Sequence, residues 1–304
     1  MIYYMVEYII IVSIIYVTKS DFPAYSTRRT GMKKALIFMV SLLAFSGGVA
    51  LGGELGNPAM LIKQGQFDVG FQWNSLFKQS FEDYDLKRTY SDGTENSGRK
   101  GADFENDQYY MTTLTYGIID QINVFARLGM VDGGNWLDYQ AGNNWKGDLE
   151  SNFVWAVGAK GKVYEFANGL GFGMAAQYMR YDNRKVKDWR SLETGETAGD
   201  LGWATDDKLD YWQLDVLANA YWTLGAFTPY VGAAYTYYDV SFSGKWTNEV
   251  PFYGQVGYDA SFSNENNFTA LVGLDVDLGM NFKANIQGTF VSSTALTLGI
   301  SYCF

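Results

Sequence analysis

Residues 212–222 read WQLDVLANAYW, and this stretch decides the fold class. One side of it carries Trp212, Leu214, Val216, Ala218, Ala220 and Trp222. The other side carries Gln213, Asp215, Asn219 and Tyr221. Because successive side chains of a β-strand point to opposite faces, the alternation predicts a strand with one apolar and one largely polar face.

The same period of two recurs along the chain from residue 66 onward, and no run of about 18 apolar residues follows Leu51. We therefore predict an all-β chain of ten strands, with eight or twelve as alternatives, since strand boundaries read from sequence are inexact. The expected strands are 66–78, 107–117, 121–131, 151–164, 169–182, 207–223, 227–241, 266–277, 281–292 and 295–304.

The connections between these strands alternate in length. Segments 79–106, 132–150, 183–206 and 242–265 are long and polar, and we expect them to be loops. The joins at 117–120, 165–168, 224–226 and 278–280 are tight. Long loops at one end and short turns at the other are typical of a transmembrane antiparallel up-and-down β-barrel, in which aromatic residues such as Trp212 and Trp222 bracket the lipid-facing band. Periodicity alone also fits a soluble barrel with its apolar face inward.

Charged residues in the strands fall on the polar faces. A charge facing lipid near the midplane costs roughly 2–4 kcal/mol, so a membrane barrel would turn these side chains into its lumen. The predicted lumen-lining charges are Asp68, Arg127, Lys160, Lys162, Asp215, Asp275 and Lys283. They would form either a salt-bridged plug or the lining of a narrow pore that large solutes cannot pass.

The first residues predict export. From Met32 the chain reads MKKALIFMVSLLAFSGGVALGG, with two lysines, an apolar stretch and small residues, as in a cleavable signal peptide over 32–52. Residues 1–31 would be an upstream extension outside the mature fold, either because Met32 is the true start or because the signal region is long. Residues 53–65 would be a short periplasmic lead, and 66–304 the barrel.

Composition argues against several function classes. The chain has no histidine and a single cysteine, Cys303, so it offers neither imidazole bases nor a multi-cysteine metal site. A net charge of −10 disfavours nucleic acid as a partner. We expect a non-enzymatic protein with no cofactor and no metal site.

The last ten residues, ALTLGISYCF, place Leu298, Ile300, Tyr302 and Phe304 on one face and end on an aromatic residue. This segment resembles the C-terminal signature of bacterial outer-membrane β-barrel proteins of Gram-negative cells, although no subfamily motif stands out. The resemblance implies that these four residues are an assembly signal read by the barrel-assembly machinery. It also implies periplasmic chaperones, outer-membrane lipid and lipopolysaccharide as partners. Histidine-dependent activities of the barrel proteases and lipases cannot be carried over.

Two functions are compatible with such a small barrel. The first is a narrow passive pore for ions or small solutes. The alternative is a structural or adhesive barrel whose long loops contact surfaces; in the 183–206 segment, Lys185, Lys187 and Arg190 could meet lipopolysaccharide phosphates, and Trp189 could contact a partner or pack on its own rim.

Overall fold

The computed structural model describes residues 60–82, 84–139, 144–248 and 254–304, all within one unit, Val49–Phe304. The expected upstream extension, the signal peptide and residues 53–59 of the lead lie outside the described residues. None of the described segments is a helix long and apolar enough to span a membrane.

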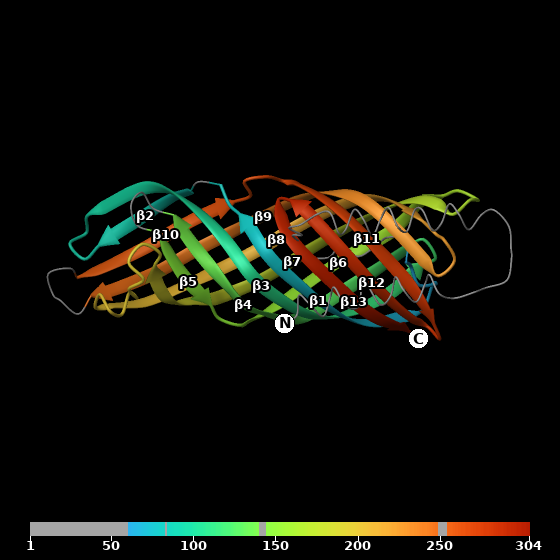
Figure 1. Cartoon of the computed structure of the whole chain (residues 1–304), viewed down its shortest axis with the longest axis horizontal. Helices are drawn as coiled ribbons and strands as arrows, with labels where there is room; N and C mark the ends of the chain where they lie inside the picture. The colour runs from blue at the N-terminus through green and yellow to red at the C-terminus, as the bar shows by residue number, and fades with distance from the viewer. Residues whose placement is uncertain (1–59, 83, 140–143, 249–253) are drawn as a thin grey trace, which may run out of the picture. The chain divides into compact units, whose positions relative to one another are not determined.

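Ten antiparallel strands close into a ring, in the order β1–β3–β4–β6–β7–β8–β9–β11–β12–β13 and back to β1 (Figure 1). Their bounds are β1 Phe67–Ser80, β3 Glu95–Ile119, β4 Ile122–Tyr139, β6 Asn152–Glu165, β7 Leu170–Ser191, β8 Trp203–Trp222, β9 Phe227–Asn248, β11 Phe268–Gly279, β12 Phe282–Val291 and β13 Ser293–Cys303. The first and last strands close the ring, with pairing from Asp68↔Cys303 to Gln79↔Ser293. The predicted ten-stranded barrel is confirmed.

Three further strands build a second, narrower ring at the end of the barrel that lies away from β13's C-terminus. They are β2 Tyr84–Tyr90, β5 Trp145–Leu149 and β10 Gln255–Ser263, seen beyond the main barrel in Figure 1. Beyond the turn of the β12–β13 hairpin, β10 pairs with β2 and closes this second ring. Its eight strands follow the order β2–β3–β4–β5–β7–β8–β9–β10. We call this part the outer extension and define it as the described residues of 81–107, 131–149, 181–211 and 238–263.

The outer extension corrects the prediction of long polar loops. Segments 79–106, 132–150, 183–206 and 242–265 are largely β-structure, because β3, β4, β7, β8 and β9 run on past their predicted ends. Its ladders are long; β8, for example, pairs with β9 from Trp203↔Asn248 to Tyr221↔Tyr230. Only short stretches, such as 192–202, remain irregular among the described residues.

The wall of the ten-stranded part is apolar on its outside. Outward side chains such as Leu128 (58% exposed), Phe153 (55%) and Val231 (54%) are more than half exposed. A soluble barrel would bury these groups, since exposed apolar patches of this extent are costly in water. The lipid-facing orientation predicted from the alternation is therefore the one observed.

Aromatic girdles mark both edges of this wall. The outer girdle crosses four strands through ring contacts of 5.6 Å between Trp155 and Tyr178, 6.0 Å between Tyr178 and Trp212, and 5.2 Å between Trp212 and Tyr237. The inner girdle consists of Phe67–Tyr116 (4.8 Å), Phe282–Tyr302 (4.8 Å) and Tyr302–Phe304 (4.9 Å). Trp212 lies in the outer girdle, and Trp222 ends β8 at the level of the inner one. At about 3.3 Å per residue and a strand tilt near 40°, the segment between them spans about 25 Å along the barrel axis, which matches the height of the apolar band of a membrane barrel.

In the outer extension the polarity of the two faces is reversed. Aromatic and aliphatic side chains turn inward, including Phe104, Trp136, Leu209 and Val240, each fully buried. Outward positions are polar or charged and exposed: Lys185, Asp206, Lys208, Ser241 and Lys245. The extension therefore has the cross-section of a water-soluble barrel standing on a membrane barrel.

Local backbone irregularities lie where the polarity changes. Asn106 in β3 and Asn183 in β7 have positive φ (62° and 55°), and Gly133 in β4 has a φ of 65°. A bulge between Tyr181 and Arg184 shifts the register of β7 against β8. Bulges re-aim side chains, and here they bring a charged pair, discussed below, into the interior.

Candidate functional site

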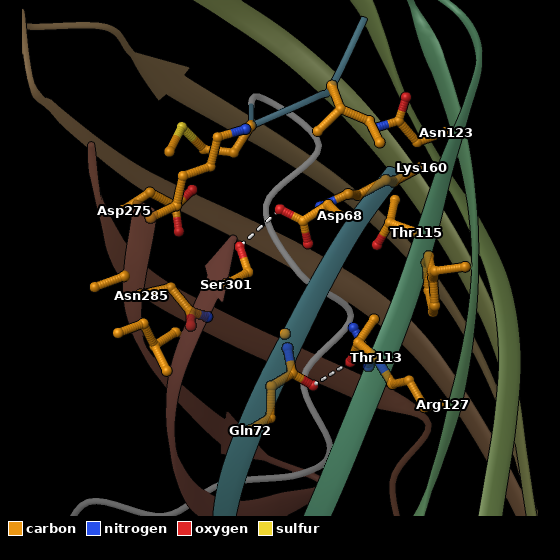
Figure 2. Close-up of a pocket in the computed structure, with 17 residues that line it drawn as sticks. Asp68, Gln72, Thr113, Thr115, Asn123, Arg127, Lys160, Asp275, Asn285 and Ser301 are labelled. Atoms are coloured by element: carbon orange, nitrogen blue, oxygen red, sulfur yellow. Dashed lines mark hydrogen bonds between the residues drawn. The ribbon is translucent and has the colours of Figure 1, made fainter. Parts of the chain in front are cut away.

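A cavity of about 80 Å³ lies in the lumen near the inner girdle (Figure 2). Its walls come from both ends of the sequence, β1, β3, β4 and β6 on one side and β11, β12 and β13 on the other. Polar side chains at inward positions line it: Asp68, Gln72, Thr113, Thr115, Asn123, Arg127, Lys160, Asp275, Lys283, Asn285 and Ser301. The alternation of each strand places these groups inside, because their sequence neighbours face lipid.

Five of the seven predicted lumen charges meet at this cavity, namely Asp68, Arg127, Lys160, Asp275 and Lys283. Asp68 accepts a hydrogen bond from Ser301 Oγ at 2.9 Å, which ties β1 to β13 across the closing seam. The guanidinium of Arg127 lies 4.5 Å from the centre of the Phe125 ring. Both charge signs share the space, so the cavity is polar without being strongly cationic or anionic.

The other two predicted residues lie elsewhere. Lys162 forms an ion pair with Glu165 at 2.8 Å near the β6–β7 turn and lies 5.9 Å from the ring centre of Tyr221. Asp215 is buried above the cavity and accepts hydrogen bonds from Gln213 Nε2 and Thr236 Oγ1, each 2.8 Å long. Neither lines the cavity.

A buried hydrogen-bonded layer forms the roof of the cavity. Arg127 donates to Gln177 Oε1 at 2.5 Å, and Tyr211 donates to Gln213 Oε1 at 2.6 Å. On the far side of Asp215, Thr236 bonds to Thr269 at 3.1 Å, and Thr269 bonds to Ser292 at 2.5 Å. The side chains of this layer are at most 5% exposed, so the layer is tightly packed across this part of the interior.

Above this layer stands a fully buried ion pair. Arg184 donates to both carboxylate oxygens of Asp107 at 2.9 Å, and both side chains have no exposed surface. Arg184 also donates to the backbone carbonyls of Gly133 (2.6 Å) and Glu150 (2.9 Å), so these four bonds use four of its five N–H groups. The alternation of the sequence could not reveal this pair, since the inward position of Arg184 depends on the bulge between Tyr181 and Arg184 in β7.

Aromatic rings fill the outer extension beyond the ion pair. Phe81 packs edge-on against Phe104 (4.9 Å) and Phe262 (4.9 Å), and Trp136 stacks on Phe242 (5.8 Å). A second group centres on Trp246, which contacts the rings of Trp145, Trp189, Trp203 and Tyr258. Residues 192–202 fold over the far end, where Ala198 is buried and bonded to the backbone of Trp189 and Trp203.

Asp207 is buried within the second aromatic group. Its Oδ2 accepts hydrogen bonds from the indole nitrogens of Trp189 and Trp246, both at 2.7 Å. Burial raises the pKa of this carboxyl to about 6, against the opposing effect of the two indole donors. Trp189, which the sequence allowed either to contact a partner or to pack on its own barrel, therefore packs inside the barrel.

Residues 60–66, which are the described part of the predicted lead (60–65) and the first residue of the predicted barrel, lie at the inner mouth of the cavity. Met60 and Ile62 line the cavity, and Ile62 is only 4% exposed. The predicted lead was placed outside the barrel fold and carried no role, and nothing in its composition signals insertion.

No protein-family model matches the chain, and no curated protein matches its sequence. Solved structures of similar fold include the outer membrane protein OprG from Pseudomonas aeruginosa, at 14% identity and a TM-score of 0.44, covering 80% of this chain and 97% of that one. The translocator domain of autotransporter NalP from Neisseria meningitidis aligns at 12% identity with a TM-score of 0.39, covering 90% of this chain and 97% of that one. Ail, the attachment invasion locus protein of Yersinia pestis, aligns at 8% identity with a TM-score of 0.28, covering 79% of this chain and 99% of that one.

These values are too low to transfer a function, and the assignment of fold comes from the chain's own geometry. A closed antiparallel ring, an apolar wall between two aromatic girdles and a polar interior are features of one class of protein. The chain has the fold of the bacterial outer-membrane β-barrel proteins.

Proposed function

We propose that the protein is a closed outer-membrane barrel whose rigid outer extension contacts surfaces or partners outside the cell. The observation that carries this proposal is the aromatic filling of the extension, with Trp136, Phe104 and Tyr238 all 0% exposed inside a wall of charged side chains. Conduction through the barrel does not require such a core. A rigid structure that projects above the membrane into water requires buried apolar surface for its stability. The proposed role is non-enzymatic and needs no cofactor.

The location in the outer membrane is part of the proposal. The apolar band and girdles support a bilayer setting, and the short turns at the end carrying β13's C-terminus support a periplasmic position for that end. Leu298, Ile300, Tyr302 and Phe304 lie along the outward face of β13, next to β1 in the closing seam. Their role as an assembly signal, and the chaperones and assembly machinery that would read it, stay predictions.

A narrow passive pore is the second candidate. The observation in its favour is the polar cavity, into which Arg127, Lys160 and Lys283 all project. We rank it second because Gln177 and Asp215, which belong to the hydrogen-bonded layer above the cavity, are each 2% exposed. Conduction would require these side chains to move, and selectivity would then follow the charges that line the cavity.

Two measurements on the reconstituted full chain test the proposal. In planar bilayers we expect no reproducible conductance steps; ion-selective steps would favour the pore instead. Proteoliposomes should also be retained on supported layers carrying lipopolysaccharide or heparin, and not on plain phosphatidylcholine. Retention should fall when Lys185 and Lys208, exposed on the extension, are both replaced by Glu, and should not change for Lys63→Glu at the opposite end. Absence of retention on every layer would remove the surface-contact function.

A further inference from the structure

The two ends of the lumen are sealed in different ways. The outer end is filled by a hydrophobic core rich in aromatic rings, to which all eight strands of the extension and the segment 192–202 contribute. The inner end is covered by one short segment, residues 60–66, hereafter the lead, in which Met60 and Ile62 line the cavity and only Ile62 is buried. Removing the first seal means unfolding a hydrophobic core, whereas removing the second means releasing a few contacts.

Those contacts are specific and come from the β3–β4 turn region and from β12. Gly65 N–H donates to the carbonyl of Gly117 at 2.8 Å, and Gly117 N–H donates to the carbonyl of Gln66 at 3.1 Å. Gln64 N–H donates to Asp120 Oδ1 at 3.0 Å, and Lys283 Nζ donates to the carbonyl of Leu61 at 3.4 Å. The lead is held at a defined place by its backbone.

Asn123 provides a further contact inside the mouth. With its side-chain amide oriented to suit its neighbours, Asn123 accepts a hydrogen bond from Ile62 N–H at 2.8 Å and donates to the Ile62 carbonyl at 3.2 Å. These bonds replace the strand partners that Ile62 lacks inside the barrel. They let an isolated backbone segment enter a polar lumen without leaving its own groups unbonded.

Close packing against Gly117 completes the seal. A Cβ at position 117 would collide with the carbonyl oxygen of Lys63, so the lead sits in a space that only glycine leaves open. Gly117 does not have a positive φ, so the backbone alone does not require glycine there. The requirement comes from the lead.

We propose that the lead is a displaceable stopper: its release opens the charged cavity to the periplasm while the aromatic core keeps the outer end shut. The barrel then has two states, a sealed one and one with a water-filled vestibule on the inner side only. This inference is independent of whether the extension contacts surfaces.

The stopper can be tested by the accessibility of a cysteine placed in the cavity. Thr113 lines the cavity and is 7% exposed, and the chain's only cysteine, Cys303, can be replaced by Ser. In the Thr113→Cys, Cys303→Ser background, the purified folded barrel should react slowly with a membrane-impermeant thiol reagent. Adding Gly117→Ala should raise the rate by about tenfold or more, because local opening of the lead exposes the thiol.

Two further variants keep the test decisive. Asp120→Ala releases only the bond to Gln64 at the exposed surface, so it should give a smaller increase without disturbing the barrel. Gly288→Ala in β12 is the matched control, since a Cβ there meets only Phe290 and Val272 at ordinary contact distances of 3.4–3.6 Å, and the rate should not change. Fast labelling of the Thr113→Cys, Cys303→Ser background itself would overturn the stopper. Slow labelling that stays unchanged in the Gly117→Ala variant and in the Asp120→Ala variant would also overturn it.

Discussion

The membrane wall and the outer extension are built from the same strands but have opposite faces buried. Along β8, Leu214 and Val216 face outward below the outer girdle, and Asp206 and Lys208 face outward above it. The inward positions of β8 carry both polar and apolar side chains along its whole length, from Asp207 and Leu209 in the extension to Asp215 and Leu217 in the membrane wall. The phase of the alternation in β8 never shifts, so the surrounding solvent alone decides which chemistry each face must carry.

The buried pair at the border between the two regions gives the largest expected effect. Replacing Asp107 by Leu leaves the guanidinium of Arg184 buried without its counter-charge, and we expect a loss of about 3–5 kcal/mol in the free energy of unfolding. Urea unfolding of the reconstituted barrel, followed by tryptophan fluorescence, measures it. The double variant Asp107→Leu with Arg184→Met should be more stable than Asp107→Leu. Equal stability of the two would show that the charge is not the cause.

A charge placed on the outside tests the reversal of polarity directly. Leu128→Arg in the membrane wall should cost roughly 2–4 kcal/mol, because the guanidinium faces lipid. Ser241→Arg, also outward but in the extension, should change stability by no more than about 0.5 kcal/mol, because its side chain meets water. Both are exposed positions of regular strands. Similar costs at the two sites, in the same unfolding assay, would contradict the assignment of the extension to an aqueous environment.

The sequence predicts the membrane wall well because one rule applies to it throughout. Lipid requires apolar side chains at every second position, and residues 212–222 or 296–304 satisfy that rule without exceptions on the outward face. The inward orientation of Arg127 and Lys160 follows from the same rule. No long-range information is needed to place these residues.

The outer extension and the stopper could not be predicted in the same way. Outward residues there are hydroxyl-bearing and charged, such as Ser241, Ser243 and Lys245 in SFSGKWTN at 241–248, and such segments resemble loops. Positive φ angles at Asn106 and Asn183 and the bulge between Tyr181 and Arg184 interrupt the period further. The insertion of Ile62 and the pairing of Arg184 with Asp107 depend on contacts between distant segments, for which a single sequence carries no signal.

The buried carboxyl of Asp207 predicts a pH effect confined to the extension. The carboxyl of an unfolded chain ionises near pH 3.9, whereas burial raises the pKa of Asp207 to about 6 in the folded protein. The folded state therefore binds more protons between these values, and its stability falls as the pH rises from about 4 to about 6, by up to about 3 kcal/mol. Comparing wild type with Asp207→Asn from pH 4 to pH 8 isolates this group. A variant with an unchanged pH profile would exclude Asp207 as the source.

The smallest effect is expected from an ion pair on the outside of the extension. Lys187 Nζ lies 3.3 Å from Glu150 Oε1, and the two side chains are 54% and 39% exposed. Water screens this pair and the long side chains lose entropy on pairing, so Lys187→Ala should cost less than about 1 kcal/mol. The backbone carbonyl of Glu150 also accepts a hydrogen bond from buried Arg184. Exposed Lys187 and buried Arg184 can therefore be compared as two cations that contact the same residue. If Lys187→Ala destabilised the barrel as much as Asp107→Leu, the outer face of the extension would be as dry as its core, and the proposed aqueous platform would have to be abandoned.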